Sequence, residues 1–285
     1  MARWLVTGAA GMLGREADQI LRAAGHEVEA CDRNRLDVTD ARAVHDAVRG
    51  CDIVVNAAAW TDVDGAEKNE ADATALNGTA VENLATACAE SHALLLHIST
   101  DYVFPGTARA PIPEDAPPEP INAYGRSKLA GESAVTRMLP RGGYIVRTAW
   151  LYGEHGRNFV TTILRAAEQR DFLDVVDDQR GQPTSAGALA AALLALGLSA
   201  MAEGAPPGVY HATCRGETTW YGLARAAFEL TGLDPDRVRP TTTDKFPRPA
   251  PRPAYSVLRH DRWEAAGLPP LPAWQDSLAA FLSAG

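Results

Sequence analysis

Short apolar segments alternate with helix-forming segments from residue 3 to residue 147, and this alternation constrains the fold more than any other feature. The apolar runs predict strands at residues 3–7, 26–31, 52–55, 93–98 and 143–147. The segments between them predict helices at residues 12–24, 41–48, 70–91 and 122–138. These strands are apolar without polar alternation, which is typical of a parallel sheet covered on both faces. We therefore predict an α/β fold with a doubly wound, Rossmann-like parallel sheet over the first 150 residues.

The rhythm breaks after Trp150, and a smaller C-terminal lobe is expected there. The predicted helices are residues 157–169, 185–202, 220–230 and 273–283, and the predicted strands are residues 173–176 and 209–211. Prolines are dense from Pro240 to Pro253, which argues against regular structure in that segment. We expect it to form an ordered loop of the smaller lobe, because Phe246, Tyr255 and Leu258 can anchor it.

The composition and net charge of the chain argue against some classes of binding partner. Apolar residues make up 46% of the 285 residues, and the formal net charge is −9. An acidic chain is a poor binder of nucleic acid or of an anionic membrane, and no apolar run approaches the ~18 residues of a membrane span. The four cysteines form no CxxC pair and the histidines form no HExxH motif, so no metal site is predicted and a reducing cytoplasm is expected.

A glycine-rich turn joins the first predicted strand to the first helix. Gly8, Gly11 and Gly14 recur every third residue there, with Met12 and Leu13 between the last two. Glycine allows a sharp turn and a close approach to a pyrophosphate, and the helix N-terminus offers free N–H groups to its oxygens. We therefore predict a dinucleotide-binding domain over residues 1–150, with part of 185–202 packing back on it. Residues 151–285 would mainly form a substrate-binding lobe.

Charged residues after the second predicted strand bear on the choice of cofactor. Asp32 stands where a carboxylate would meet the ribose hydroxyls of NADH, whereas the neighbouring Arg33 would suit the 2′-phosphate of NADPH. Asp37 and Val38 follow at a place where the adenine ring could lie. We expect NADPH to be preferred and NADH to be usable.

Tyr124 and Lys128 are spaced i, i+4 on a predicted helix, so both side chains lie on one face. An ammonium beside the phenol would lower the pKa of Tyr124 towards neutrality and let it exchange a proton with a carbonyl oxygen. Thr100 ends the fourth predicted strand, at the edge of the sheet where ligands bind, and could hydrogen-bond the same oxygen. The three residues predict an acid–base site.

Motifs along nearly the whole chain carry a family resemblance. They include Gly8–Gly14, Val55–Ala59, Ser99–Phe104, Tyr124 with Lys128, Arg147–Tyr152, Asp178-Gln179, Thr218–Trp220 and Arg252-Pro253. On these motifs the chain resembles the extended short-chain dehydrogenase/reductases and, more narrowly, the dTDP-4-dehydrorhamnose reductase family. The resemblance implies an NAD(P)H-dependent oxidoreductase that reduces the C4 ketone of a dTDP-4-keto-6-deoxy sugar, most simply dTDP-4-dehydro-L-rhamnose to dTDP-L-rhamnose.

The resemblance also implies residue roles. Tyr124 would be the general acid, Lys128 its partner and ribose anchor, and Thr100 would orient the C4 carbonyl. Asp101 and Trp150 would contact the sugar, and Arg252 would meet the charge of the thymidine diphosphate. The residues expected to touch the cofactor after the third strand are Ala59, Trp60 and Thr61. Trp60 is large for a residue lining that cleft. The acidic set that binds a divalent ion in some relatives is not recognisable in the sequence.

Several alternatives stay open at this point. A reductase acting on another dTDP-4-ketosugar of secondary metabolism would share the same motifs. A cofactor-binding regulatory subunit without turnover is a different class, although it would have no chemical need for Thr100, Tyr124 and Lys128. An epimerase or dehydratase of the same superfamily fits less well, because the Ser-Thr-Asp and Arg-Pro motifs match the reductases better. Either a monomer or a homodimer is compatible with the sequence.

Overall fold

Six parallel strands form the central sheet of the computed structural model, which describes residues 1–283. The strands are β1 (Arg3–Thr7), β2 (Glu27–Cys31), β3 (Ile53–Asn56), β4 (Leu94–Thr100), β5 (Gly143–Thr148) and β10 (Gly208–His211). Their order across the sheet is β10-β5-β4-β3-β1-β2, and every neighbouring pair is parallel. The predicted α/β class with a parallel sheet is therefore confirmed.

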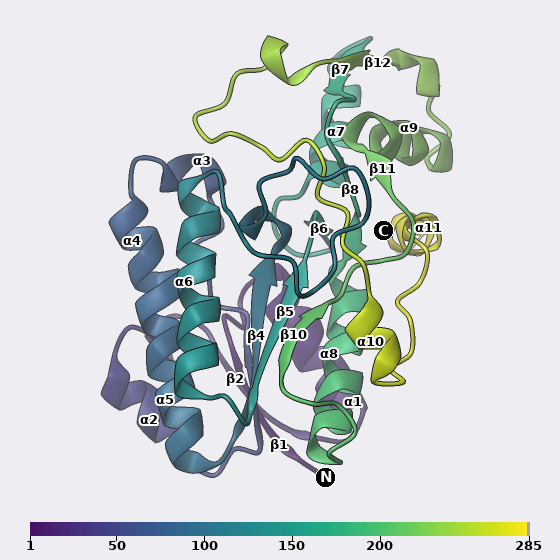
Figure 1. Cartoon of the computed structure of the whole chain (residues 1–285). Helices are drawn as coiled ribbons and strands as arrows, with labels where there is room; N and C mark the ends of the chain where they lie inside the picture. The colour runs from purple at the N-terminus through teal and green to yellow at the C-terminus, as the bar shows by residue number, and fades with distance from the viewer. Residues whose placement is uncertain (284–285) are drawn as a thin grey trace.

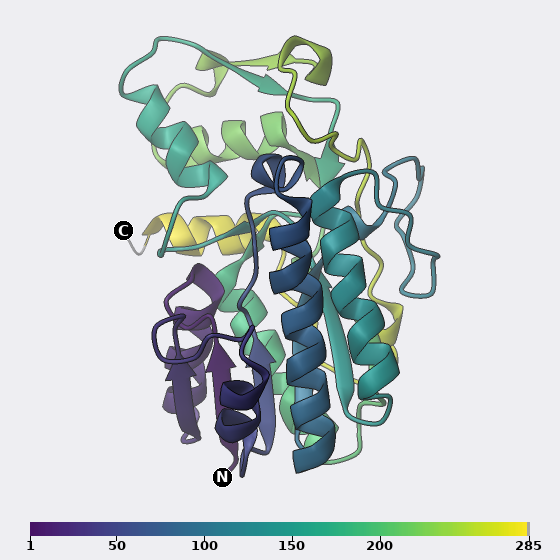
Figure 2. The same ribbon diagram turned by 90° about the vertical axis from the view of Figure 1, so that its left-hand side faces the viewer.

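Helices cover both faces of the sheet (Figures 1 and 2). The helices are α1 (Met12–Ala23) and α8 (Ala186–Met201) on one face, and α2 (Ala41–Val48), α5 (Ala80–Ser91) and α6 (Ala123–Met138) on the other. Neighbouring residues of β1 point to opposite faces of the sheet. Trp4 packs in the hydrophobic core under α1 and α8, and Leu5 packs in the core under α2, α5 and α6. A Cβ at Gly197 would lie 2.3 Å from the Trp4 ring, so this glycine lets α8 pack closely on β1.

The segment predicted as a helix over residues 70–91 is helical throughout and contains one widened turn. It consists of α4 (Glu70–Thr74), a π-helical turn η1 (Ala75–Thr79) and α5. Helix α6 packs tightly on that turn, because a Cβ at Gly131 would lie 2.2 Å from the Asn77 carbonyl oxygen. The prediction of a helical segment over residues 70–91 is confirmed, although periodicity does not register the single widened turn within it. Such turns are frequent at functional sites.

The smaller lobe stands at the carboxyl ends of the sheet strands (Figure 1). It contains α7 (Phe159–Ala167), β7 (Leu173–Val176), α9 (Trp220–Leu230), β12 (Val238–Thr241) and, nearer the sheet, α11 (Trp274–Ser283). Strand β12 pairs with β7 and includes Pro240, so the prediction that the proline-dense segment lacks regular structure was wrong at its first residues. The short two-stranded sheet leaves edge positions that tolerate a proline.

Helix α8 and strand β10 follow α7 and β7 of the smaller lobe in sequence but lie with the main sheet. Helix α8 packs on α1, and β10 pairs with β5 at the sheet edge, with Val209 opposite Ile145. Strand β10 therefore belongs to the main sheet and α8 covers one face of it, although both come after the predicted boundary at residue 150. The functional division into a dinucleotide-binding domain and a substrate-binding lobe stays a prediction. Within residues 1–283, none of the helices is long and apolar enough to cross a membrane.

Candidate active site

A cavity of about 1060 Å³ lies at the carboxyl ends of the central strands. The connection after β1 runs to β2 on one side of the sheet, whereas the connection after the adjacent β3 runs to β4 on the other side. Ligands bind at such a switch point. The predicted site residues that line this cavity are Gly8, Gly11, Met12, Leu13, Gly14, Asp32, Arg33, Asp37, Val38, Ala59, Trp60, Thr61, Thr100, Asp101, Tyr124, Lys128 and Trp150. Of the predicted site residues, Arg252 alone does not line it.

Each of the three glycines in the first turn is required for a different structural reason. Gly8 has a φ of +67°, and a Cβ there would lie 2.6 Å from the backbone nitrogen of Ala58. A Cβ at Gly14 would lie 2.3 Å from the Gly8 oxygen, so helix α1 packs directly on the turn. At Gly11 a Cβ would meet only that same oxygen at 3.2 Å, and the residue lines the cavity. The space beside Gly11 is therefore open to a ligand.

The N-terminus of α1 fits the pyrophosphate of a dinucleotide. Gly11 is its N-cap residue and provides no side-chain hydrogen bond to the first turn. The first N–H groups of a helix have no partner within the helix, and the positive end of the helix dipole favours an anion. The backbone of this turn can therefore hold a phosphate without any basic side chain.

Charges at the far end of the cavity bear on the ribose of a dinucleotide. The Asp32 carboxylate accepts hydrogen bonds from the Asn34 and Arg35 amides, both at 3.0 Å, which leaves its second oxygen for a ligand. Hydrogen bonds from Thr39 and the nearby charge of Arg33 hold the pKa of Asp37 below its usual value. A carboxylate and a guanidinium thus border the same end of the cavity, and the structure leaves both NADPH and NADH compatible with it.

Tyr124 stands in the first turn of α6, and it lines the cavity together with Thr100. The Thr100 hydroxyl donates to Asp101 Oδ1 at 3.0 Å. Asp101 is 1% exposed, and its Oδ2 has no hydrogen-bond partner among the described residues. Burial raises the pKa of Asp101 to about 6, although hydrogen bonds from Ser256 and Thr100 oppose the shift. Three oxygens that can bind a hydroxyl or a carbonyl group thus meet at the end of β4.

The expected effect of Lys128 on Tyr124 is not found. Burial and the charge of Asp101 raise the pKa of Tyr124, and only the hydrogen bond with Thr100 opposes this. Lys128 Nζ instead donates to the Ile98 carbonyl oxygen at 2.6 Å. Burial lowers the pKa of Lys128 to about 8, against the opposing charge of Glu132. The prediction of a lowered tyrosine pKa was wrong for the chain by itself, and Tyr124 holds its proton at neutral pH.

Asn77 is a buried polar residue that sequence analysis missed. It lies in the π-helical turn. Its Oδ1 accepts a hydrogen bond from the Trp60 backbone amide at 2.9 Å. Its Nδ2 donates hydrogen bonds to the Trp60 carbonyl oxygen at 3.1 Å and to Ser127 Oγ at 2.9 Å. These bonds tie the cavity-lining loop after β3 to the helix that carries Tyr124. An Asn-Gly pair inside a long predicted helix was the available signal.

Trp150 lies in an unusual conformation at the mouth of the cavity. Its φ is +48°, and its indole stacks on Trp220 with ring centroids 3.7 Å apart and planes 7° from parallel. A Cβ at Gly181 would lie 2.5 Å from the Trp150 ring, and Trp220 Nε1 donates to Gln179 at 3.1 Å. Trp220 also lines the cavity, although the sequence analysis assigned it no site role. The stacked pair forms a rigid aromatic wall.

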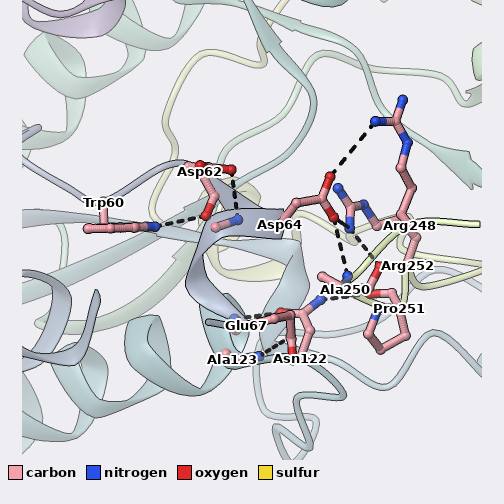
Figure 3. A network of polar contacts seen from close by, with 12 residues as sticks. Trp60, Asp62, Asp64, Glu67, Asn122, Ala123, Arg248, Ala250, Pro251 and Arg252 are labelled. Atoms are coloured by element: carbon pink, nitrogen blue, oxygen red, sulfur yellow. Dashed lines mark hydrogen bonds and ion pairs between the residues drawn. The ribbon is translucent and has the colours of Figure 1, made fainter. Parts of the chain in front are cut away.

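Arg252 is not brought to the site. Its guanidinium donates to Asp64 Oδ1 at 2.7 Å and lies in a polar network that joins the smaller lobe to the start of α6 (Figure 3). The diphosphate contact expected of Arg252 is therefore not supported, because Asp64 neutralises the charge outside the cavity lining. Asp64 itself could not be identified from spacing, since 188 residues separate the pair.

One group of potential metal ligands occurs within residues 1–283. Ligand atoms of Glu16, Glu154 and His155 lie within 4.8 Å of one another. These residues do not line the cavity, and exposed acidic groups often occur together without an ion. That the protein needs no metal stays a prediction.

Comparisons with known proteins agree along the whole chain. Residues 2–285 match the family described as the RmlD substrate binding domain. A dTDP-4-dehydrorhamnose reductase from Streptomyces griseus is 54% identical over 97% of this chain and 91% of its own. A dTDP-4-keto-6-deoxy-D-glucose reductase from Streptomyces niveus is 50% identical over 97% and 95%. The structure of a dTDP-4-dehydrorhamnose reductase from Bacillus anthracis in complex with NADP superimposes with a TM-score of 0.93, at 34% identity over 100% of this chain and 99% of that one.

Proposed function

The chain belongs to the RmlD substrate binding domain family, and from this premise we propose that it is an NADPH-dependent reductase of a dTDP-4-keto-6-deoxy sugar. The favoured reaction is dTDP-4-dehydro-L-rhamnose to dTDP-L-rhamnose, as in the name of the S. griseus relative. The observation that carries the proposal is that the Thr100–Tyr124–Asp101 cluster and the glycine turn line one cavity. A proton donor and a dinucleotide site are thus within reach of one substrate.

The residues fit a bound dinucleotide at three places. The N-terminus of α1 would hold the pyrophosphate beside Gly11, and Asp32 and Arg33 would meet the adenosine ribose. Lys128 would anchor the second ribose. When bound, NADPH supplies the hydride that C4 of the sugar receives.

Tyr124 is proposed as the general acid. Its raised pKa keeps the phenol protonated at neutral pH, which suits a group that must deliver a proton to the C4 oxygen. Thr100 would orient that oxygen through its hydroxyl. After proton delivery, the Tyr124 phenolate would regain a proton from solvent. The role proposed for Lys128 is that of ribose anchor.

Asp101 and Trp150 are proposed to bind the sugar. The Asp101 Oδ2 is buried without a partner, and a buried acceptor of this kind needs a donor such as a sugar hydroxyl. The Trp150–Trp220 stack presents an apolar face on which a deoxy sugar can rest.

A reductase of a different dTDP-4-ketosugar is the second candidate. The S. niveus relative, a dTDP-4-keto-6-deoxy-D-glucose reductase, is nearly as similar as the S. griseus relative. A non-catalytic regulatory subunit is a third, less favoured alternative, because it has no need for Thr100 and Tyr124 together in the cavity lining. We further propose a cytoplasmic protein, monomeric or homodimeric, that uses NADH as a second cofactor.

A panel of nucleotide 4-ketosugars with NADPH consumption as the readout tests the proposal. Turnover should be fastest with dTDP-4-dehydro-L-rhamnose, and the Tyr124→Phe variant should lose about 10²–10⁴-fold in kcat while it still binds NADPH. The control is Tyr221→Phe, because Tyr221 does not line the cavity. NADPH binding without reduction of any sugar by the native protein would indicate the regulatory alternative, and near-native turnover by Tyr124→Phe would refute the acid assignment.

A further inference from the structure

The proline-rich segment of residues 246–253 leaves the smaller lobe and crosses to the sheet domain. It meets Asp64, in the short helix α3 (Val63–Ala66), as Figure 3 shows. Asp64 Oδ1 accepts hydrogen bonds from Arg252 at 2.7 Å and from the Ala250 amide at 3.2 Å, and Arg248 lies 3.9 Å from Oδ2. One carboxylate therefore holds three groups of a segment that lies more than 180 residues away in sequence.

The same segment is bonded to the helix that carries the proposed acid. Asn122 donates to the Pro251 carbonyl oxygen at 2.9 Å while its own Oδ1 caps α6 by accepting the Gly125 amide at 2.8 Å. Glu67, which follows α3, accepts the Ala123 amide at 2.8 Å. Tyr124 is therefore flanked by residues whose backbone or side chain belongs to this network. A movement of the segment would be transmitted to the first turn of α6.

A second close approach fixes the far end of the segment. Gly106 has a φ of +81°, and a Cβ there would lie 2.4 Å from Cα of Pro253. The Tyr255 amide donates to the Gly106 carbonyl oxygen at 3.1 Å. The segment is thus held both beside α3 and beside the loop that follows β4, the strand that ends in Thr100.

The Asp64–Arg252 pair is partly shielded from solvent. The side chains are 27% and 17% exposed, whereas those of the pair Glu70–Arg126, between α4 and α6, are 44% and 46% exposed. Burial by itself would raise the pKa of Asp64. The pKa is nevertheless lowered, because Arg252 and Ala250 donate hydrogen bonds to the carboxylate and the charges of Arg252 and Arg248 lie nearby. The carboxylate is ionised at neutral pH, and a shielded, charge-assisted hydrogen bond is stronger than an exposed ion pair.

We propose that Asp64 is a positioning residue, which acts through Arg252 to hold the proline-rich segment on the start of α6 and so keeps the smaller lobe closed over the sugar end of the cavity. Neither side chain lines the cavity, so the effect reaches the substrate through placement of the lobe and of the α6 N-terminus. The inference rests on the proposed function, since it assigns a role towards the keto sugar of that reaction.

Steady-state kinetics of Asp64→Asn test the inference. This isosteric variant should raise KM for the keto sugar about tenfold, the effect of losing one charge-assisted hydrogen bond. It should lower kcat by a smaller factor, because the same network holds the first turn of α6, which carries Tyr124. Its affinity for NADPH, measured by calorimetry, should not change. The matched control is Glu70→Gln, which removes a charge from an equally short pair on α6 and should leave both parameters unchanged.

A double-mutant cycle separates positioning from general stability. If Asp64 acts through Arg252, Asp64→Asn combined with Arg252→Met should raise KM no more than either single change does. Additive effects, an unchanged KM in Asp64→Asn, or a joint loss of kcat and NADPH affinity would each overturn the inference. Inactivity of the native protein towards every keto sugar would instead refute the proposed function itself, so the two failures are distinguishable.

Discussion

Replacing Asp101 by asparagine should stabilise the protein increasingly as the pH rises. Asp101 is buried, its Oδ2 has no partner, and desolvation raises its pKa from 3.8 to about 6. A carboxyl whose pKa is raised on folding favours the folded state fully below its unfolded pKa and loses that contribution as the pH rises through its folded pKa. Asparagine cannot ionise, so the variant does not have this loss.

The magnitude follows from the shift. About two pKa units at 1.36 kcal/mol each correspond to about 3 kcal/mol of stability that the native protein lacks at pH 8 relative to pH 4. The difference in unfolding free energy between Asp101→Asn and the native protein should therefore grow by up to about 3 kcal/mol across that range, mostly between pH 4 and pH 6. Any constant cost of the amide group cancels in this comparison.

Urea unfolding followed by tryptophan fluorescence at several pH values measures this difference. Asp64→Asn serves as the control of opposite sign, because hydrogen bonds and the charges of Arg252 and Arg248 lower the pKa of Asp64. The stability that the Asp64 carboxylate contributes is present above its unfolded pKa and is lost as the pH falls through its folded pKa. The difference in unfolding free energy between Asp64→Asn and the native protein should therefore stay constant from pH 5 to pH 8. A constant difference for Asp101→Asn over pH 4–8 would refute the argument and indicate a solvated carboxyl.

Three further changes test the cavity. Gly11→Val should weaken NADPH binding at least about tenfold in calorimetry with the fold kept, because the space beside Gly11 is open in the protein and would be needed by the pyrophosphate; unchanged binding would place the pyrophosphate elsewhere. Gly181→Ala should displace the Trp150 ring, cost about 1–3 kcal/mol of stability in urea unfolding and raise KM for the keto sugar; native-like values would mean that the indole does not contribute. Arg33→Ala should weaken NADPH by about 1.5–3 kcal/mol and leave NADH nearly unchanged in steady-state kinetics, whereas equal losses would mean that Arg33 points to solvent.

Sequence alone was sufficient for the features that depend on local pattern. The apolar runs predicted five of the six strands of the main sheet, and the glycine triplet predicted a turn that the structure places at the edge of the cavity. The spacing of Tyr124 and Lys128 predicted that both would line it, as they do. Such features follow from strand and helix periodicity and from the steric freedom of glycine, which neighbouring residues determine by themselves.

Tertiary structure decided what depends on distant partners. A strand at residues 209–211 was predicted from sequence, but only the pairing of β10 with β5 placed it in the main sheet. The π-helical turn at Asn77 is set by packing against α6, and the pKa of Tyr124 is raised by burial and Asp101, which helical spacing does not encode. Arg252 carries a motif of the family, yet its charge is used by Asp64, 188 residues away. A charged side chain binds whichever opposite charge the fold brings nearest, and that distance is a property of the folded chain and not of the spacing along it.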